Sequence, residues 1–345
     1  MPVDRGYLLG QLRQSRRTAW NGMLNTINDL SPATAAQLLY FRRTGKYLNL
    51  KRPTDFNEKL QWLKIYWDDP LKAICADKYQ VYHYVASQGC DHILNRLLAV
   101  YESPDEIIWD ELPEKFALKC THGCKYNIVT RNKHELDPEA VRQQLWQWMG
   151  ERFGRKSLEP HYDRITPRII LEAYIETPSG LLPWDYKIFC FNGKAKLVEV
   201  CSEREQGLRV DFFDLDWNTL PISLEELRRD TPPEPPACLP EMLACAEKLA
   251  KPFPFVRVDL YDNEGTPMLG ELTFTPNSSM STRLNEEGLR YLGDLLTLPD
   301  APLDDSSPSI PDAANRPLAD KPLTNTPLTN TPLSDPSRSR QAGEG

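Results

Sequence analysis

Residues 255–276, with the sequence FVRVDLYDNEGTPMLGELTFTP, constrain the fold more than any other part of the chain. Apolar and polar residues alternate from 256 to 261, which is the period of a β-strand. Asp-Asn-Glu-Gly at 262–265 is typical of a tight turn, and a second apolar run follows from about 268 to 274. The sequence therefore predicts two antiparallel strands joined by a short turn.

Three charged residues interrupt these two apolar strands: Arg257, Asp259 and Glu271. A buried charge is costly unless it is paired or binds a metal. Asp259 and Glu271 can face one another on adjacent strands, and two converging carboxylates suit a Mg²⁺ ion that also holds phosphate. We therefore expect a magnesium site here. The alternative is a surface hairpin whose charged face is solvated.

The composition argues against several classes of protein. The 345 residues carry a formal net charge of −8 without an extended basic cluster, which argues against nucleic-acid binding. No apolar run approaches the roughly 18 residues of a membrane span, and the N-terminus lacks the apolar core of a signal peptide. The expected location is therefore the cytoplasm, where the eight cysteines would be reduced and mostly buried.

The two ends of the chain differ from its middle. Residues 1–46 have a loose helical period and a basic face formed by Arg13, Arg16 and Arg17. They predict a helical extension that is solvated or makes at most a peripheral contact with a membrane or an anionic carrier. Residues 47–105 are expected to form a lead-in region. Residues 298–345 are rich in Pro, Asp, Ser, Thr and Asn, which predicts a disordered tail.

The sequence contexts of three lysines predict that these side chains bind an anion. Lys119 is the only charge in the apolar run FALKC, so an anion or solvent at the strand end must satisfy it. Lys187 alternates with Ile188 in DYKIFCFNG and is expected to face a cleft. Lys78 follows Asp77 at the start of a predicted helix, whose N-terminus favours an anion such as phosphate.

Two arginines follow a strand predicted at 198–202. Arg204 and Arg209 are candidates for binding an acceptor substrate, because a guanidinium binds carboxylate or phosphate in a bidentate manner.

Seven segments of the chain occur together in a recognisable order: FNEKLQW, ADKY, FALKCTHG, LEAYI, DYKIFCFNGK, FFDLDWN and PFVRVDLYDNEG. In combination they resemble the TupA-like ATP-grasp family, named for teichuronopeptide biosynthesis, over about residues 47–296. The resemblance implies an α+β ATP-grasp fold in which two α+β subdomains clasp the nucleotide. It places the core at 106–297 and implies ATP and Mg²⁺ as cofactors.

The resemblance also implies roles for individual residues. ATP would be contacted by Lys78, Lys119, Gly123, Glu172, Tyr174, Ile175 and Lys187. Asp259 and Glu271 would bind Mg²⁺, and Arg257 and Lys187 would act in catalysis. Thr273 stands where the family has a third metal ligand, Asn. Asn277 is therefore a candidate substitute at the metal or the substrate.

The chain departs from the family at residues 121–127, which read THGCKYN. ATP-grasp relatives have a loop with three glycines here, over the phosphates of the nucleotide. Glycine permits close backbone approach and left-handed torsions. Cys124 and Lys125 therefore predict looser closure of the loop, unless the charge of Lys125 compensates.

The activity that the resemblance implies is ATP-dependent carboxylate–amine ligation, in which an amide forms through an acyl phosphate. The substrates would be an amino acid, a uronic acid or a peptide-polymer precursor, in the synthesis of a cell-envelope polysaccharide. Two alternatives stay open. One is a glycosyltransferase of polysaccharide biosynthesis, with Asp214 and Asp216 as a D-x-D metal motif. The other is a degenerate ATP-grasp protein without catalytic activity.

Overall fold

The hairpin predicted at 255–276 is present and forms one edge of a six-stranded antiparallel sheet in the computed structural model. Glu264 and Gly265 form its turn with φ of 54° and 83°, the left-handed pair of a tight hairpin. The strand order is β10-β9-β5-β6-β7-β8. These strands are β5 (Asp185–Phe191), β6 (Lys194–Ser202), β7 (Arg209–Phe213), β8 (Thr219–Leu220), β9 (Phe255–Asn263) and β10 (Thr266–Thr273).

The structure describes residues 5–176, 183–203 and 207–300, with side chains from residue 18 onward. The side chains of Arg13, Arg16 and Arg17, the acceptor candidate Arg204, and the predicted tail from 301 onward therefore lie outside the described residues.

A second, four-stranded antiparallel sheet has the order β1-β4-β2-β3. Its strands are β1 (Leu97–Tyr101), β2 (Phe116–Cys120), β3 (Asn127–Thr130) and β4 (Ile169–Ala173). β1 belongs to the predicted lead-in region and pairs with β4 of the predicted core, so the sheet is built from both.

The helices are α1 (Arg5–Leu30), α2 (Pro32–Thr44), α3 (Phe56–Tyr66), α4 (Pro70–Ala76), α5 (Gln80–Ser87), α6 (Pro138–Met149), α7 (Phe153–Ser157), α8 (Leu239–Ala250) and α9 (Glu286–Leu295). Short 3₁₀ helices are η1 (Asp91–Ile93), η2 (Pro104–Glu106), η3 (Trp109–Glu111), η4 (Lys133–Glu135), η5 (Pro160–Arg164), η6 (Glu225–Leu227) and η7 (Pro276–Ser279). Within the described ranges, no helix combines the length and the apolar character needed to cross a membrane.

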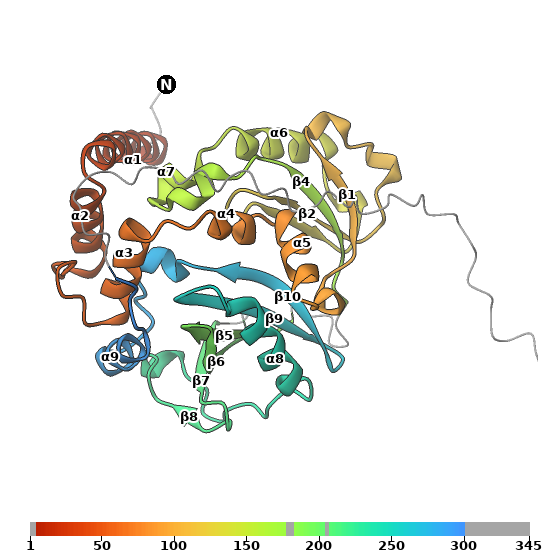
Figure 1. Ribbon diagram of the computed structural model, residues 1–345. Helices are drawn as coiled ribbons and strands as arrows, with labels where there is room; N and C mark the ends of the chain where they lie inside the picture. Colours follow the sequence, from red (N-terminus) through yellow and green to blue (C-terminus); the bar gives the residue numbers. More distant parts are fainter. Residues whose placement is uncertain (1–4, 177–182, 204–206, 301–345) are drawn as a thin grey trace, which may run out of the picture. The chain divides into compact units, whose positions relative to one another are not determined.

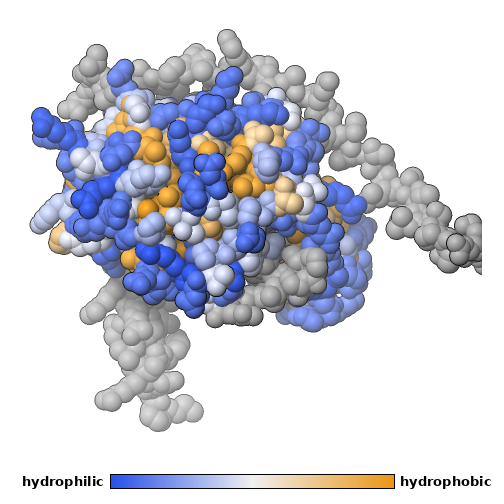
Figure 2. All heavy atoms as spheres, turned by 90° about the horizontal axis from the view of Figure 1, so that it is seen from below, coloured by the Kyte–Doolittle hydropathy of each residue, from blue (hydrophilic) through white to orange (hydrophobic). Residues whose placement is uncertain are grey.

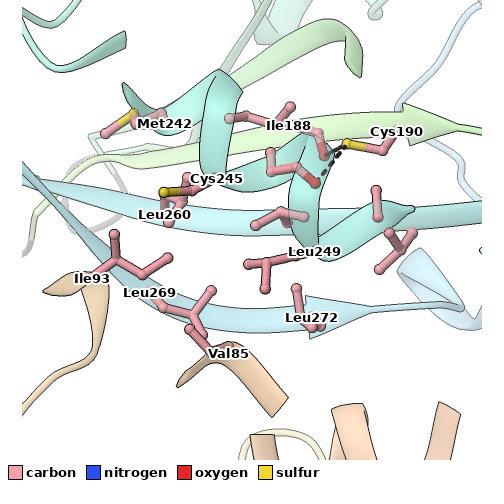
Figure 3. Packing of buried hydrophobic residues seen from close by; sticks show 14 of the residues in the cluster. Val85, Ile93, Ile188, Cys190, Met242, Cys245, Leu249, Leu260, Leu269 and Leu272 are labelled. Carbon is pink, nitrogen blue, oxygen red and sulfur yellow. Dashed lines mark hydrogen bonds between the residues drawn. The ribbon is translucent and has the colours of Figure 1, made fainter. Parts of the chain in front are cut away.

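The largest apolar core lies on one face of the six-stranded sheet, beneath α8 (Figure 1). Met242, Cys245 and Leu249 of α8 lie over the sheet residues Ile188 and Leu260 (Figure 3). The same cluster extends at β10 to the side chains of α4 and α5, which lie between the two sheets (Figure 1). The hairpin at this edge of the sheet therefore packs against α8 and also against α4 and α5.

The opposite face of the six-stranded sheet changes character along its strands. At one end Phe189, Phe212 and Phe255 pack against Phe56 of α3 and Leu292 of α9. Charged residues replace the aromatic ones farther along the same face. They share this face because every second residue of a strand points to the same side of the sheet. The outer surface seen from below is mostly hydrophilic, with apolar side chains gathered near the middle of the view (Figure 2).

Candidate functional site

The charged face comprises the side chains of Asp185, Lys187, Glu199, Arg257, Asp259 and Glu271. The register of the sheet brings them together, because Lys187 is paired with both Asp259 and Glu199 on the neighbouring strands. Phe189 and Phe255 of the aromatic end follow this group along β5 and β9 on the same face.

Asp259 is the centre of a buried ion-pair network. Arg257 Nε and Nη2 donate to its two oxygens at 2.7 and 2.6 Å. Lys187 Nζ donates to Asp259 Oδ2 at 2.9 Å and lies 3.2 Å from Asp185 Oδ2. Burial alone would raise the pKa of Asp259, but the charges of Arg257 and Lys187 outweigh burial and hold the pKa below its ordinary value. Asp259 is therefore ionised at neutral pH.

Glu271 faces Asp259 because of a β-bulge. Leu269 pairs with Leu260, so an unbroken register would place Glu271 opposite Val258, on the face covered by α8. The register shifts between Leu269 and Glu271, and Glu271 pairs with Asp259 instead. Its side chain is 37% exposed, lies 4.0 Å from Arg257 Nη2, and accepts a hydrogen bond from Thr273 at 3.0 Å.

These two carboxylates have the donor chemistry of a nucleotide-bound magnesium site. Among the described residues, no group of three or more His, Cys, Asp and Glu is arranged to hold a metal. Mg²⁺ commonly takes only one or two carboxylates and fills its shell with phosphate and water, so a pair is sufficient. Asp259 already accepts three hydrogen bonds, whereas Glu271 accepts one, so most of the free acceptor sites are on Glu271.

A pocket of about 390 Å³ joins Glu271 to the other sheet. Lys119 of β2, Glu172 of β4 and Lys78 line it from one side, and residues 269–272 of β10 line it from the other. Lys119 Nζ lies 2.5 Å from Glu172, which also accepts a hydrogen bond from Tyr82 at 2.8 Å. Two lysines beside Glu271 suit a phosphate chain with its cation.

The loop at 121–127 connects β2 and β3 as predicted, and Lys78 Nζ donates to the carbonyl oxygen of Gly123. A Cβ atom at Gly123 would lie 2.7 Å from the ring of Tyr126, so close packing requires glycine there. Lys125 has a φ of 66°, the left-handed conformation that a glycine would adopt without strain. Cys124 and Lys125 are both exposed at the tip of the loop.

Several predicted residues lie elsewhere. Tyr174 receives a hydrogen bond from Arg131 at 2.6 Å, and Tyr174 and Ile175 follow the end of β4 without lining the pocket. Arg209 donates to the carbonyl oxygens of Glu226 and Arg228 at 3.2 Å, away from the charged face.

Two further residues lie outside the pocket between the sheets. Asn277 lies in η7 and lines a second pocket beside Arg257. The carboxylate of Asp214 forms hydrogen bonds within its own turn, where it accepts from the backbone N–H groups of Asp216 and Asn218. No observation therefore favours a D-x-D metal site at this turn.

Two members of the charged face were not predicted from the sequence. Asp185 lies two residues before Lys187, and Glu199 lies within the strand predicted at 198–202. The signal that identifies them is the period-2 alternation, which places Asp185 on the same face as Lys187 and marks Glu199 as a charge in a buried strand.

Solved structures with a related architecture are only distantly similar. D-alanine–D-alanine ligase from Bacillus anthracis complexed with ATP is 15% identical, with a TM-score of 0.36, over 65% of this chain and 63% of that one. The ATP-grasp ligase PsnB, complexed with minimal precursor, Mg and ADP, is 13% identical, with a TM-score of 0.35, over 69% and 63%. The chain thus spans less than two thirds of either protein.

Sequence comparison gives a more decisive result. No curated protein has significant similarity to the chain. Residues 58–297, however, match the family model described as TupA-like ATPgrasp. This range includes both sheets, the loop at 121–127 and the hairpin that carries Asp259 and Glu271. The chain belongs to the TupA-like ATP-grasp family.

Proposed function

We propose that this protein is an ATP-dependent ligase that joins a carboxylate to an amine. One observation carries the proposal: the carboxylate of Glu271 and the lysines Lys78 and Lys119, from different parts of the fold, line the same pocket. A pocket with this combination of charges suits a polyphosphate accompanied by a divalent cation. Membership of an ATP-grasp family supports the same nucleotide.

The residues have distinct roles in this proposal. Lys78, Lys119 and Lys187 hold phosphate oxygens, and Asp259 and Glu271 hold Mg²⁺. Glu172, with Tyr174 and Ile175 after β4, contacts the nucleoside. ATP with Mg²⁺ supplies a phosphoryl group that converts a carboxylate oxygen into a leaving group.

In the next step the amine substrate reacts with the activated carboxylate. The amine nitrogen forms a bond to the carbonyl carbon, inorganic phosphate leaves with the C–O bonding electrons, and the nitrogen loses a proton. Arg257 stabilises the negative oxygen that develops at the carbon under attack. Its orientation is fixed by two hydrogen bonds to Asp259.

The proposed substrates follow from the family resemblance. They are an amino acid and a uronic acid, or a growing peptide, in a precursor of a cell-surface polymer. The direct test is a screen of amino acids and uronic acids, alone and in pairs, for ADP release by the full chain. ADP release that requires both a carboxylate and an amine supports ligation. Transfer of sugar from a nucleotide-sugar, or no turnover with any pair, would overturn it.

The cysteines offer a second test that does not depend on turnover. Cys124 is exposed and the other seven cysteines are buried, so a thiol reagent should label Cys124 selectively. We expect ATP with Mg²⁺ to slow this labelling several-fold, because bound phosphates lie under the loop tip. Cys124→Ser is the control and should remove the fast phase. An unchanged labelling rate at saturating nucleotide would mean that the loop does not cover the phosphates.

A further inference from the structure

One short stretch of the chain is basic, although the chain as a whole is acidic. Residues 30–54 contain no acidic residue and five basic ones, which are Arg42, Arg43, Lys46, Lys51 and Arg52. All five are exposed, at the end of α2 and in the loop that follows it. The formal net charge of the chain is −8, so this stretch has the opposite sign. Such a local concentration of positive charge attracts an anionic partner.

Apolar side chains are exposed in the same stretch. Leu38 and Phe41 lie three positions apart on α2, and therefore on one side of the helix, and are 37% and 47% exposed. Tyr47, in the loop after α2, is 80% exposed, and its ring centroid is 5.1 Å from that of Phe41. We call Leu38, Phe41 and Tyr47 the α2 patch. Exposed apolar side chains that gather in this way among polar ones mark a surface for interaction.

Three of the cations are available to a partner at the surface. The side chains of Lys51 and Arg52 form no ion pair or hydrogen bond with any described residue. The side chain of Asn49 bonds to the backbone N–H and carbonyl oxygen of Arg52 at 3.0 and 2.9 Å, which fixes the loop. Lys46 pairs with Glu286 at 2.8 Å, but both side chains are more than half exposed, so water and salt weaken this pair.

The other two cations attach α2 to its neighbours. The guanidinium carbon of Arg42 lies 4.2 Å from the ring centroid of Trp20 on α1. Arg43 Nε donates to the carbonyl oxygen of Met280 at 3.3 Å, and Tyr40 packs against Met280 on the buried side of α2. α2 is thus held between α1 and the segment after β10, beside α3 (Figure 1). The α2 patch therefore lies on a helix that is already fixed before a partner binds.

The combination of cations and apolar side chains fits the surface of a membrane that contains anionic lipids. Phosphate groups of such lipids attract Lys and Arg side chains that lie close to the surface, and each additional cation strengthens the attraction. Aromatic side chains are favoured at the boundary between headgroups and acyl chains, where one part of the side chain is apolar and another is wet. Tyr47 has this character, and Phe41 and Leu38 add apolar area beside it.

Two other anionic partners fit this surface less well. A second copy of the chain has acidic residues to offer, but a contact between two different surfaces does not close on itself and leads to open assemblies. A single-stranded nucleic acid stacks its bases on flat aromatic faces. The rings of Phe41 and Tyr47 instead pack against each other at an angle of 34°, and Leu38 provides no flat face.

We propose that the α2 patch and the basic residues around it dock the protein on a membrane surface that carries anionic lipids. Phe41 and Tyr47 enter the headgroup boundary, and Lys51 and Arg52 contact lipid phosphates. The docking uses α2 and the loop after it, whereas the basic face expected on α1 has side chains outside the described residues. A helix is about 10 Å across, so the lipid surface would lie about 10 Å from the segment 276–284 that packs under α2. The inference does not depend on the proposed ligase activity.

Co-sedimentation of the full chain with lipid vesicles tests the docking. The chain should bind vesicles of phosphatidylcholine that contain about one third phosphatidylglycerol, bind pure phosphatidylcholine far more weakly, and be released by salt. The double variant Lys51→Gln with Arg52→Gln should lower the partition coefficient about 10-fold or more. Lys196→Gln with Lys248→Gln, at exposed positions of β6 and α8, removes the same charge and is the matched control.

A second double variant, Phe41→Ser with Tyr47→Ser, tests the apolar part of the contact. It should also lower the partition coefficient about 10-fold, because the lost apolar area no longer enters the headgroup boundary. Thermal unfolding should show that the α2 variants and the control variant remain folded. The proposal is overturned by an absence of binding to anionic vesicles at low salt, or by an equal loss of binding in the control variant. Binding of single-stranded DNA, or self-association that both α2 variants abolish, in place of vesicle binding would overturn it as well.

Discussion

At the scale of single residues, Asp259 and Glu271 carry the same charge on paired strands but have different surroundings. Asp259 is 3% exposed and neutralises two buried cations, Arg257 and Lys187. Glu271 is partly exposed, and its closest cation is 4.0 Å away. The sequence alone predicts that loss of either carboxylate would abolish activity and spare the fold. The ion-pair network changes this expectation for Asp259.

We predict that Asp259→Asn lowers the free energy of unfolding by about 3–5 kcal/mol, because it leaves buried Arg257 and Lys187 without a counter-charge. Glu271→Gln should change stability by less than about 1 kcal/mol, because its carboxylate is partly solvated. Both variants should lose substrate-dependent ADP release. Urea denaturation and the ADP assay measure the two effects. Full turnover by Glu271→Gln at low magnesium concentration would contradict the metal assignment.

Lys125 provides a second residue-scale prediction. It has a left-handed backbone, which is unfavourable for a residue with a Cβ atom. Lys125→Gly should therefore raise the free energy of unfolding by about 0.5–1 kcal/mol, after allowance for the greater entropy of glycine in the unfolded chain. Lys125→Ala removes the charge but keeps the strain and is the matched control. If Lys125→Gly is no more stable than Lys125→Ala in thermal unfolding, the strain is negligible.

At the scale of elements, α3 has a wider role than packing. Its Phe56 forms a wall of the second pocket, and Asn57 and Gln61 hold the segment after β10. Two turns farther along, the Nζ atom of Lys64 is buried without a hydrogen-bond partner among the described residues. Burial lowers the pKa of Lys64 to about 8, against the opposing charge of Glu159. This lysine therefore lowers stability at neutral pH.

The pH dependence of stability tests this assignment. Between about pH 8 and 10.5 the native state releases the Lys64 proton while the unfolded chain keeps it, so unfolding takes up a proton. The contribution of Lys64 to the free energy of unfolding therefore rises with pH in this window. We predict that wild type gains stability relative to Lys64→Met by up to about 1.4 kcal/mol per pH unit.

Urea denaturation of both proteins at several pH values measures the difference. The pKa of Lys72 is also lowered to about 8, chiefly by burial and in small part by the charge of Lys64. Lys72 is present in both proteins, so only the small part of its shift that Lys64 causes enters the difference. A difference that is constant from pH 7.5 to 10 would show that Lys64 titrates normally in the native state.

At the scale of the whole molecule, the contacts of residues 296–298 extend beyond the range that the composition predicts to pack. The composition predicts that the tail from 298 does not pack. Leu298 nevertheless packs partly against the aromatic cluster, and Leu296 is 1% exposed within it. The backbone of Thr297 also exchanges hydrogen bonds with the Asn192 side chain at 2.9 and 3.1 Å. The last contacts of the chain among the described residues therefore reach residues 296–298.

We predict that truncation after Pro299 leaves the unfolding free energy and ADP release unchanged, because no described contact is lost. Truncation after Leu295 should lower stability by about 2–5 kcal/mol, because it removes a buried leucine and its neighbours from the core. Thermal unfolding of both truncations makes the comparison. Loss of turnover after Pro299 with an unchanged melting temperature would assign the tail a functional role.

The sequence by itself determined most of the local structure. Period-2 alternation located β9 and β10, the Asp-Asn-Glu-Gly turn joined them, and Lys119 and Lys187 were recognisable as lone charges in apolar strands. These features depend on residues within about ten positions of one another, so backbone sterics and local burial suffice to specify them. The family motifs added the order of the elements and the expected nucleotide.

Only the tertiary structure decided which of these residues meet. A one-residue bulge between Leu269 and Glu271 turns Glu271 toward Asp259. The alternation of apolar and polar residues does not predict where this extra residue is inserted. The pairing of Asp259 with Lys187 depends on strand neighbours that are 72 positions apart in the chain. The same holds for the second pocket beside Arg257, whose walls come from α3, the sheet and the segment after β10. Such contacts depend on long-range register and packing, which local periodicity does not encode.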